Sequence, residues 1–485
     1  MPKAAVLPLS LDPSSGTPAY RQLYEQIRAL ILEGRVCRGA RLPSTRALAA
    51  DLALSRSTVV AAYEQLASEG YLQGRHGSGI YVSDIPEESL HASPRDRRDG
   101  RRKPRPQHPP PGREPWPTPA LPLPFGSLGP DMRLFPLADW AKLVARSWRQ
   151  ADGSVLGGQP PTGHPALRRA IADHLTEWRG VSASPDRIIV TAGAGDGIEL
   201  TLRALTRRGD PVAIEDPSYV PLRTMLAAHG LRRLAIPSDS RGLALDVLEA
   251  AAPPPRVAVV TPSRQFPLGH TLPLARRLRL LDWAEATDAV IIEDDYDSEY
   301  RYAGRPIEAL AALDADERVI YVGTFSKVFS PGLRLGYLVV PGSLLGRFEA
   351  TLAAFGPRAS FHTQPALAAF MAEGLFAQHI RRTRRIYAAR QDALLGAVRE
   401  ALGSLLAVEP QTTGMHVIAR PSARLTGDDG ELSRLAAAAG VTAPALSRYF
   451  VGPPRDAGLL LGFAAFEPEE VRRAVDALAA AFAPR

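Results

Sequence analysis

Cysteine is almost absent from this chain of 485 residues, and long apolar runs are missing. Cys37 is the only cysteine, which excludes an internal disulfide and gives no support to a cysteine-based metal site. No run approaches the roughly eighteen uninterrupted apolar residues that a membrane-spanning helix needs. The N-terminal sequence MPKAAVLPLSLDP lacks the apolar core of a signal peptide. We therefore expect a cytoplasmic protein with no metal centre and no membrane partner.

The overall charge is basic. The 58 Lys and Arg residues exceed the 51 Asp and Glu residues, which gives a net charge of +7. Such a balance permits a polyanionic partner without establishing one, because basic side chains are often merely solvated. The length corresponds to about three domains at roughly 150 residues each, although large α/β enzymes use fewer. The position of the basic residues along the chain is therefore more informative than their sum.

The first eighty residues have the pattern of short helices. Apolar residues recur at helical spacing through residues 20–32, starting with Tyr20, which predicts a helix with one buried face. Ser44 is placed to cap a second helix over residues 45–52, with Arg46 directed outward. Ser55 is placed to cap a third helix. Two short helices joined by a tight turn form a helix-turn-helix.

The start of the third helix carries groups suited to DNA. The first turn of such a helix enters the major groove, where Arg56 could contact a base edge and Ser57 or Thr58 a phosphate. The sequence GRHGSGIYV, residues 74–82, then predicts a wing of two short strands. Each of these residues alone is best explained as an ordinary exposed side chain. Their ordered series favours DNA binding.

Residues 13–83 resemble the winged helix-turn-helix of the GntR superfamily, through the motifs LPSTRAL, SRSTVVAAYEQLASEGYL and the glycine-rich wing. The resemblance implies a double-stranded operator DNA partner and association with the nucleoid when bound. Val60 stands where some relatives have a further DNA-contacting arginine. The positions that match operator-contacting residues are Ser44, Arg46, Arg56, Ser57, Thr58, Arg75, His76 and Gly77.

A tether is predicted over residues 84–124. Its central part, Pro94 to Arg113, holds eight Lys or Arg residues against two Asp residues, six prolines and no large apolar residue. Such a composition cannot bury enough apolar surface to offset the loss of chain entropy. The net charge of this part is +6, eight minus two, which could add sequence-independent affinity for DNA. A merely solvated linker explains it equally well.

From Phe125 to Arg485 amphipathic helical segments alternate with short apolar runs. This alternation predicts an α/β domain with a largely parallel central sheet. Ligands of such sheets bind at the carboxyl ends of the strands, so the residues after each run are candidate site residues. The predicted strands are Ile188–Val190, Val212–Ile214, Val257–Val260, Ala289–Ile292, Val319–Val322 and Tyr337–Val340.

Lys327 lies in the loop between the last two of these runs, with a phenylalanine two residues to either side. A lysine among aromatic neighbours loses hydration in its charged form, so its pKa falls and the neutral amine becomes available for Schiff-base chemistry. Thr324, Ser326 and Arg334 add the donors that a phosphate requires. The alternative is a surface lysine whose aromatic neighbours turn into the core.

Polar residues follow other strands in a way that suits the same cofactor. Asp294 could keep a pyridinium nitrogen protonated, and Tyr296 could donate to the phenolate oxygen of a pyridoxal ring. Tyr219 could stack on a planar ring. The turn Gly193-Ala194-Gly195 opens a helix whose backbone N–H groups suit a phosphate. Each signal is weak alone, but their order, ending at Lys327, is specific.

Residues 125–485 resemble the fold-type I pyridoxal 5′-phosphate enzymes, the class I aminotransferases. The resemblance implies a large α/β domain, a smaller C-terminal α+β subdomain, Lys327 as the Schiff-base lysine, and a head-to-tail homodimer. Joined to a GntR-like head by a long linker, the chain resembles the MocR-type transcriptional regulators. The implied cofactor-binding residues are Lys327, Asp294, Tyr296, Tyr219, Arg334, Thr324, Ser326, Gly193, Ala194 and Gly195.

Four positions depart from the aminotransferase pattern. Ala194 stands where serine is common and Asp196 where glutamine is common, so the phosphate turn lacks a hydroxyl and has an acid close by. Gly158 stands where many relatives have a tyrosine that reaches the phosphate across the dimer. Leu460 stands where aminotransferases have the arginine that binds the substrate carboxylate. Without this arginine, amino-acid binding loses much of its orientation energy.

His416 and Arg264 are polar candidates for an effector pocket, although each is equally well explained as a structural residue with its hydrogen bonds satisfied. We interpret the chain as a DNA-binding regulator whose aminotransferase-like domain binds pyridoxal phosphate and senses an amine, an amino acid or pyridoxal phosphate itself, without turnover. One alternative is an active aminotransferase with an auxiliary DNA-binding head. Another is a regulator that has lost its cofactor and uses the large domain for dimerisation.

Overall fold

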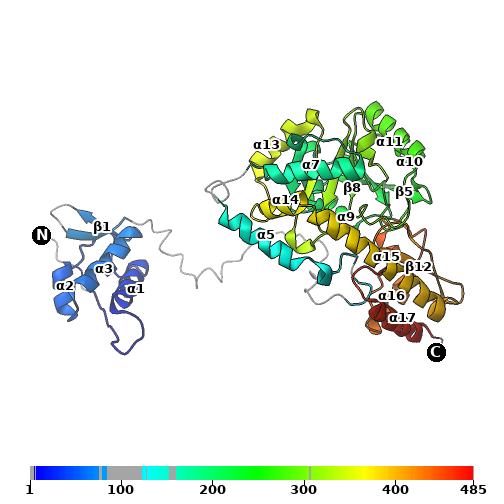
Figure 1. The fold of residues 1–485 in the computed structure, drawn as a ribbon. Helices are drawn as coiled ribbons and strands as arrows, with labels where there is room; N and C mark the ends of the chain where they lie inside the picture. Colours follow the sequence, from blue (N-terminus) through cyan, green and yellow to red (C-terminus); the bar gives the residue numbers. More distant parts are fainter. Residues whose placement is uncertain are drawn as a thin grey trace. The chain divides into compact units, whose positions relative to one another are not determined.

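The computed structural model describes residues 5, 7–75, 79–84, 123–126, 128–151, 160–304 and 307–483, with the side chain of Arg75 excepted (Figure 1). The chain divides into two compact units, Met1–Gly112 and Arg113–Arg485. Most of the predicted linker, including its basic part, lies outside the described residues, as do His76, Gly77 and Gly158. The domain boundaries at residues 83/84 and 124/125 stay predictions.

The first unit is a three-helix domain with a β-hairpin. Its apolar core forms because α1 and α3 each turn one face inward: Leu23 and Ile27 of α1 are fully buried, as are Val59 and Leu66 of α3. In the hairpin, Leu72 pairs with Val82 in an antiparallel register. The elements are α1 (Ala19–Leu32), α2 (Thr45–Asp51), α3 (Arg56–Ser68), β1 (Leu72–Arg75) and β2 (Gly79–Val82).

Among the described residues, the second unit contains an eight-stranded sheet in the order β3-β10-β9-β8-β7-β4-β5-β6. The five strands from β9 to β5 are mutually parallel, whereas β10 runs antiparallel to both of its neighbours. The predicted largely parallel sheet is therefore confirmed. The strands are β3 (Ile188–Thr191), β4 (Pro211–Asp216), β5 (Arg232–Asp239), β6 (Gly242–Leu243), β7 (Val257–Val260), β8 (Val290–Asp295), β9 (Val319–Thr324) and β10 (Gly336–Val339).

Helices cover this sheet, and a C-terminal three-stranded antiparallel sheet, in the order β11-β12-β13, forms a smaller layer of its own. The long helix α15 packs against α14 near the large sheet and against α17 in the C-terminal part (Figure 1). No helix of the described residues is long and apolar enough to cross a membrane. The remaining elements are α5 (Leu137–Arg149), α7 (Pro165–Arg179), α8 (Ala194–Leu205), α9 (Val220–Ala228), α10 (Leu245–Glu249), α11 (Leu274–Thr287), α12 (Leu310–Leu313), α13 (Leu345–Phe355), α14 (Gln364–Ala372), α15 (Leu375–Leu402), α16 (Asp429–Ala438), α17 (Pro468–Phe482), β11 (Leu406–Val408), β12 (His416–Pro421) and β13 (Leu459–Gly462).

The strands β3, β7, β9 and β10 of the large sheet are fully buried, which explains why they are almost continuously apolar. Successive side chains of β7 alternate between two apolar clusters: Val257 and Val259 pack with residues of α8, α9 and α13, while Ala258 and Val260 pack with residues of α10 and α11. Polar residues are tolerated where the strands end. The carboxyl ends of the parallel strands β4, β7, β8 and β9 therefore bring the candidate residues to one edge of the sheet.

Candidate functional site

Lys327 follows β9 and is half-buried at the strand-end edge. Phe325 and Phe329, its aromatic neighbours, are buried in the core of the unit. The amine itself donates a hydrogen bond from Nζ to the carbonyl oxygen of Leu128, at 2.9 Å. Burial lowers the pKa of Lys327, and the nearby carboxyls of Asp297 and Asp294 oppose this shift. The loop thus presents an amine with a larger neutral fraction than an exposed lysine has.

Asp294 and Asp295 are adjacent at the end of β8 but have different surroundings. Asp295 is buried and accepts hydrogen bonds from Arg179 Nε at 2.7 Å and from the hydroxyl of Tyr321 at 2.6 Å. Asp294 Oδ1 is buried and has no hydrogen-bond partner among the described residues. Burial raises the pKa of Asp294 to about 7, with Asp295 adding to the shift and Lys327 opposing it. Asp294 is thus placed to accept a hydrogen bond from a ligand N–H group.

Arg264 contacts both His416 and Tyr296. Arg264 Nη1 donates to the hydroxyl of Tyr296 at 3.0 Å, and its Nε and Nη2 donate to the backbone carbonyls of Thr413 and His416, each at 3.1 Å. His416 Nε2 lies 2.9 Å from the carbonyl oxygen of Pro267. Burial, followed by the charge of Arg264, holds the pKa of His416 well below its ordinary value. Both predicted effector-pocket residues are therefore engaged with the protein itself.

Three aromatic rings, those of Tyr219, Phe266 and Tyr296, contact one another at the site. Tyr219, directly before α9, is 49% exposed, and its ring meets that of Phe266 edge-on at 6.2 Å between centroids. Phe266 also meets Tyr296 edge-on at 5.7 Å. Burial raises the pKa of Tyr219, with the nearby Asp294 carboxyl adding to the shift and Arg334 opposing it. Tyr219 therefore combines a half-exposed side chain with a neutral hydroxyl.

The predicted phosphate turn lies at the start of α8. Gly193 adopts a φ of 99°, which favours glycine, and no side chain caps the helix there. Asp196, the unexpected acid, accepts a hydrogen bond from the backbone N–H of Ala192 at 2.8 Å and pairs with Arg358 at 3.3 Å. Because its charge is compensated in this way, Asp196 does not by itself exclude an anion from the turn.

Thr324, Ser326 and Arg334 surround the same loop. Thr324 Oγ1 accepts a hydrogen bond from the backbone N–H of Ser326 at 3.1 Å, which shapes the turn before Lys327. Arg334 follows the short 3-10 helix Pro331–Leu333 with a φ of 51° in the left-handed region, and its side chain is exposed. Its guanidinium has no hydrogen bond or ion pair with the described residues. Its donors are therefore available to a ligand.

Leu460 is fully buried in a cluster of apolar side chains. It lies opposite Ile418 on the neighbouring strand of the C-terminal sheet, and Leu268 packs in the same cluster. Leu128, which accepts the hydrogen bond from Lys327, and Phe266 pack against this cluster while remaining partly exposed. We call Leu268, Ile418, Leu446, Tyr449, Phe450 and Leu460 the apolar cluster.

Two contributors to the site were missed by the sequence analysis. Leu128 contributes its backbone carbonyl, which every residue type has, so the sequence gives no signal for this contact. Asp297 is 2% exposed, and its Oδ2 lies 3.5 Å from Arg264 Nη1, while its Oδ1 has no partner among the described residues. Burial raises the pKa of Asp297 to about 6, against the effect of Arg264. Its position directly after Tyr296 in an acidic strand end was the signal that could have found it.

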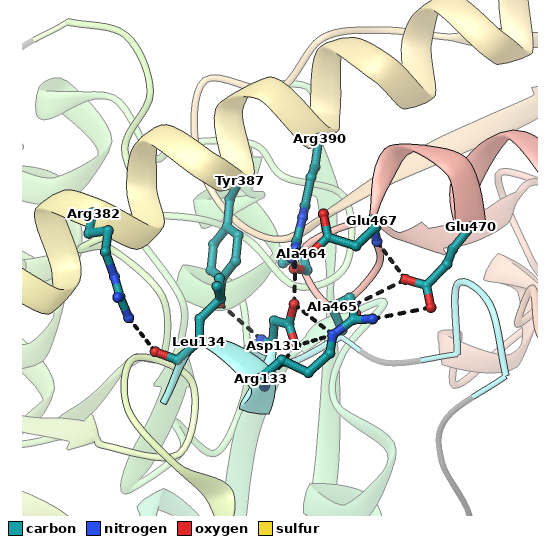
Figure 2. Close-up of polar contacts among 10 residues, drawn as sticks. All are labelled: Asp131, Arg133, Leu134, Arg382, Tyr387, Arg390, Ala464, Ala465, Glu467 and Glu470. Atoms are coloured by element: carbon teal, nitrogen blue, oxygen red, sulfur yellow. Dashed lines mark hydrogen bonds and ion pairs between the residues drawn. The ribbon is translucent and has the colours of Figure 1, made fainter. Parts of the chain in front are cut away.

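An ionic network centred on the buried pair Asp131 and Arg390 holds the segment that carries Leu128. Figure 2 shows Asp131 between two arginines, with Arg390 Nη2 and Arg133 Nε each 2.9 Å from a carboxylate oxygen of Asp131. Arg133 also reaches Glu470 of α17 at 3.0 Å, and Arg390 pairs with Glu467. The backbone N–H of Asp131 donates to the hydroxyl of Tyr387 in α15 at 2.9 Å (Figure 2). This network ties the start of the second unit to α15 and α17.

In the first unit, Ser44 and Ser55 cap α2 and α3 by accepting hydrogen bonds from Ala47 N–H at 3.2 Å and Thr58 N–H at 3.1 Å. Arg46, Arg56 and Ser57 are exposed, while Thr58 is half-buried. The hydroxyls of Ser57 and Thr58 also contact Ser55 Oγ, at 2.8 Å and 2.7 Å. The side chain of Arg75 and the wing residues His76 and Gly77 lie outside the described part of the chain. The exposed guanidinium of Arg56 at the start of α3 is therefore free to meet a major groove.

Two family descriptions match the two units. Residues 19–82 match the bacterial regulatory proteins of the gntR family, and residues 128–478 match aminotransferase class I and II. The chain is 38% identical to the probable rhizopine catabolism regulatory protein MocR of Rhizobium meliloti, over 98% of this chain and 96% of that protein. It is 36% identical to the pyridoxine biosynthesis transcriptional regulator PdxR of Corynebacterium glutamicum, over 96% of this chain and 97% of that protein.

Solved structures resemble the second unit. An archaeal alanine:glyoxylate aminotransferase superposes with a TM-score of 0.68 and 25% identity, covering 75% of this chain and 91% of its own. The α-aminoadipate aminotransferase LysN of Thermus thermophilus, solved with N-(5′-phosphopyridoxyl)-L-leucine, gives a TM-score of 0.66 and 28% identity. That match covers 74% of this chain and 92% of LysN. The predicted fold-type I class, with a winged helix-turn-helix at the N-terminus, is confirmed.

Proposed function

Because the chain belongs to the MocR-type family of GntR transcriptional regulators, with a class I and II aminotransferase-like unit, we propose that this unit binds pyridoxal 5′-phosphate at Lys327. We further propose that a ligand received at this site changes the binding of the winged helix-turn-helix to operator DNA. The observation that carries the cofactor proposal is Asp294 Oδ1, a buried carboxylate oxygen without a partner among the described residues.

The residues present fit the cofactor. Asp294 would accept the hydrogen bond of the pyridine N–H, and Tyr296 would bind the ring hydroxyl oxygen. Tyr219 would stack on the ring through its half-exposed face. When bound, pyridoxal phosphate supplies an aldehyde that condenses with primary amines. Lys327 would present its amine to that aldehyde, helped by burial, which lowers its pKa.

The phosphate would be held where helix α8 begins. The backbone N–H groups after Gly193 lie at the positive end of the α8 dipole. A Cβ atom added at Gly193 or at Gly195 would meet no atom within 4 Å. Arg334, whose guanidinium has no partner among the described residues, would supply the cationic contact, and Thr324 and Ser326 the hydroxyls. Ala194 supplies backbone only.

We propose that DNA is read by the exposed start of α3, with Arg56 at base edges and Ser57 or Thr58 at phosphates. Coupling requires that the ligand binds one arrangement of the protein better than another. We also propose a head-to-tail homodimer; the exposed apolar residues Leu137 and Trp148 on α5 support an association surface. The size in solution, measured by light scattering, tests the dimer.

Absorbance tests the cofactor proposal. Full-length protein incubated with pyridoxal phosphate should show a visible band, and borohydride reduction should fix the mass of the cofactor on the peptide that contains Lys327. Lys327→Ala should abolish both signals. Lys142→Ala is the matched control, because Lys142 is an exposed lysine on α5 of the same unit. No band in the wild type would refute the proposal.

The rival function is an active aminotransferase with an auxiliary DNA-binding head. It requires a cation for the carboxylate of an amino donor, and Leu460 and the fully engaged Arg264 do not provide one. Steady-state turnover of an amino acid and a keto acid by the cofactor-loaded protein would support the rival.

A further inference from the structure

The second unit restricts which ligands can lie beside Lys327. Three features of the described residues bear on the charge of such a ligand: the hydrogen bonds of the buried Arg264 guanidinium, the two acidic groups near the lysine, and the apolar cluster against which Leu128 packs. The inference rests on the proposed function, since it concerns the ligand of the same site.

Arg264 is the buried cation of this site, and it is already occupied. Each of its three nitrogens has an acceptor: Nε bonds Thr413 O, Nη2 bonds His416 O, and Nη1 bonds the hydroxyl of Tyr296. The guanidinium is also held in place sterically. A Cβ at residue 414 would lie within 2.3 Å of Arg264 Cζ, so the side chain occupies space that only the glycine at 414 leaves open. Arg264 cannot turn toward a ligand carboxylate without giving up these bonds.

Two acidic groups lie near the lysine. Asp297 faces Arg264 at 3.5 Å and leaves its Oδ1 without a partner among the described residues, and Asp294 Oδ1 is likewise unpartnered. Both carboxyls act on Lys327 through their charges. A carboxylate brought into this neighbourhood meets two acids and one engaged guanidinium, so it loses hydration without gaining an ionic partner. An amine suffers no such penalty.

The remaining neighbour of the lysine is apolar. In the register of the C-terminal sheet, Ile418 and Leu460 are opposite each other, and His416 lies two residues before Ile418 on the same face. This face therefore presents Leu460 and Ile418 beside the residues that contact Arg264. Leu128, hydrogen-bonded to Lys327, packs against the same cluster, as does Phe266. A hydrocarbon group would find apolar contacts with the partly exposed Leu128 and Phe266, whereas an anion would find no ionic partner in either side chain.

We propose that the ligand recognised beside Lys327 is a primary amine that lacks a carboxylate and whose carbon chain is apolar. Its nitrogen is presented at the Lys327 end of the site, and its chain lies toward Leu128, Phe266 and the apolar cluster. Amino acids, which carry a carboxylate on the carbon next to the nitrogen, are disfavoured because, among the described cations of the site, Arg264 is engaged with the protein and Arg334 is assigned to the phosphate.

Matched ligand pairs test the proposal in full-length, cofactor-loaded protein. The probes are 3-methylbutylamine against L-leucine and 2-phenylethylamine against L-phenylalanine, since each pair differs only by the carboxylate. The change in visible absorbance and the shift in the unfolding temperature are followed against ligand concentration. The amines should reach half-saturation at concentrations about tenfold or more below the amino acids. L-Leucine methyl ester, which has no negative charge, should behave like the amines.

Equal or tighter binding of the amino acids would overturn the proposal, and so would a protein that binds neither class. Both outcomes presuppose a visible band. A protein without the band instead contradicts the cofactor proposal, so the two failures are distinguishable.

Two variants test the residues. Leu460→Arg adds a guanidinium to the apolar cluster. It should increase the affinity for L-leucine relative to that for 3-methylbutylamine by about tenfold. Leu460→Met is the control of similar volume. Because an arginine in the core can prevent folding, Asp297→Asn provides a nearly isosteric second test. It removes the negative charge that faces Arg264, so the half-saturation concentrations of the amine and the amino acid should become more similar. An unchanged preference in folded Asp297→Asn protein would contradict the proposed origin of the selectivity.

Discussion

Lys327 donates its hydrogen bond to the carbonyl oxygen of Leu128, a residue 199 positions earlier in the chain, across 2.9 Å. The segment around Leu128 is also fixed by Phe125, whose carbonyl oxygen accepts from Gly462 N–H at 3.1 Å, and by Asp131 in the network of Figure 2. The first segment of the second unit thus contacts both the lysine loop and the C-terminal elements. Lys327 therefore contacts a segment that follows the predicted linker directly in sequence.

The ionic network around Asp131 should be a large contributor to the stability of the second unit. Asp131 is 4% exposed and Arg390 is 2% exposed. Asp131→Ala leaves the Arg390 guanidinium buried with one carboxylate fewer, so we expect the free energy of unfolding to fall by about 3 kcal/mol. Urea denaturation followed by circular dichroism measures it. Asp476→Ala, an exposed position on α17, should change the free energy by less than about 0.5 kcal/mol. Equal effects would contradict this role.

Asp294 should make the stability of the cofactor-free protein depend on pH. Its pKa is raised to about 7 by burial, whereas an unfolded aspartate titrates near pH ~4. The folded state therefore binds the additional proton, and this favourable contribution is lost as pH rises from about 4 to about 7. The unfolding temperature of the wild type should fall across this range relative to Asp294→Asn.

Loading with pyridoxal phosphate provides the control for that experiment. A pyridine N–H donating to Asp294 would stabilise the ionised carboxylate and lower its pKa, so the difference between the two pH profiles should shrink. Glu215 and Asp297 also have raised pKa values, about 7 and about 6, with burial as the main cause of each shift. The charge of Asp294 is only a minor contributor to the shift of Glu215, so the pH dependence from these two groups is largely common to both proteins. Parallel profiles for cofactor-free wild type and Asp294→Asn would contradict the raised pKa of Asp294.

Much of the sheet and its edge could be predicted because apolar runs bounded by polar residues report where buried strands end. Val257–Val260 was predicted with its bounds, but the strand predicted to end at Ile292 extends to Asp295. Its acidic end is stable inside the sheet because partners arrive from elsewhere: Glu293 accepts from the N–H groups of Leu310 and Ala311, and Asp295 from Arg179. A local sequence pattern cannot predict partners that are so distant in the chain.

The same limit applies to the contacts that hold the site. The pairing of Asp131 with Arg390 joins residues 259 positions apart, and the carbonyl of Leu128 carries no signal in its side chain. Helical periodicity also placed Tyr20 on the buried face of α1, which is wrong, since it is 40% exposed. Tyr20 lies in the first turn, where the apolar stripe extends beyond the buried residues that start at Leu23. Helical periodicity predicts which face of a helix is buried, but not how far along the helix the packing partner extends.

Arg56 should determine the affinity of the first unit for its operator. A guanidinium that bonds two acceptors of a guanine typically contributes about 1–3 kcal/mol, so Arg56→Ala should weaken binding about tenfold or more. Fluorescence anisotropy with a fragment of the upstream promoter at fixed salt measures the affinity. Arg21→Ala on α1 is the matched control, because Arg21 is exposed and pairs with Glu25. Unchanged affinity of Arg56→Ala would refute the assignment of α3 to the groove.

Removing residues 94–113 should reduce the salt dependence of operator binding. This segment carries a net charge of +6, eight basic minus two acidic residues, and each neutralised phosphate contributes about 0.9 to the slope of log affinity against log salt. Replacement by a Gly/Ser linker of equal length keeps the reach of the tether while removing its charge. A slope equal to that of the wild type would indicate a solvated linker.

Arg334 should have opposite effects on cofactor affinity and on the stability of the cofactor-free protein. Its φ of 51° is unfavourable for a residue with a side chain, and its guanidinium has no hydrogen bond or ion pair with the described residues to offset this strain. Arg334→Gly should therefore raise the stability of the cofactor-free protein by about 1 kcal/mol. The same change removes a charge-assisted contact to the phosphate, so the affinity for pyridoxal phosphate should fall about tenfold or more.

Thermal unfolding and absorbance titration measure the two effects separately. Arg334→Ala should lower the affinity equally but keep the backbone strain. If Arg334→Gly lost stability together with affinity, the arginine would be a structural residue; a gain in stability at reduced affinity is what a strained ligand contact requires.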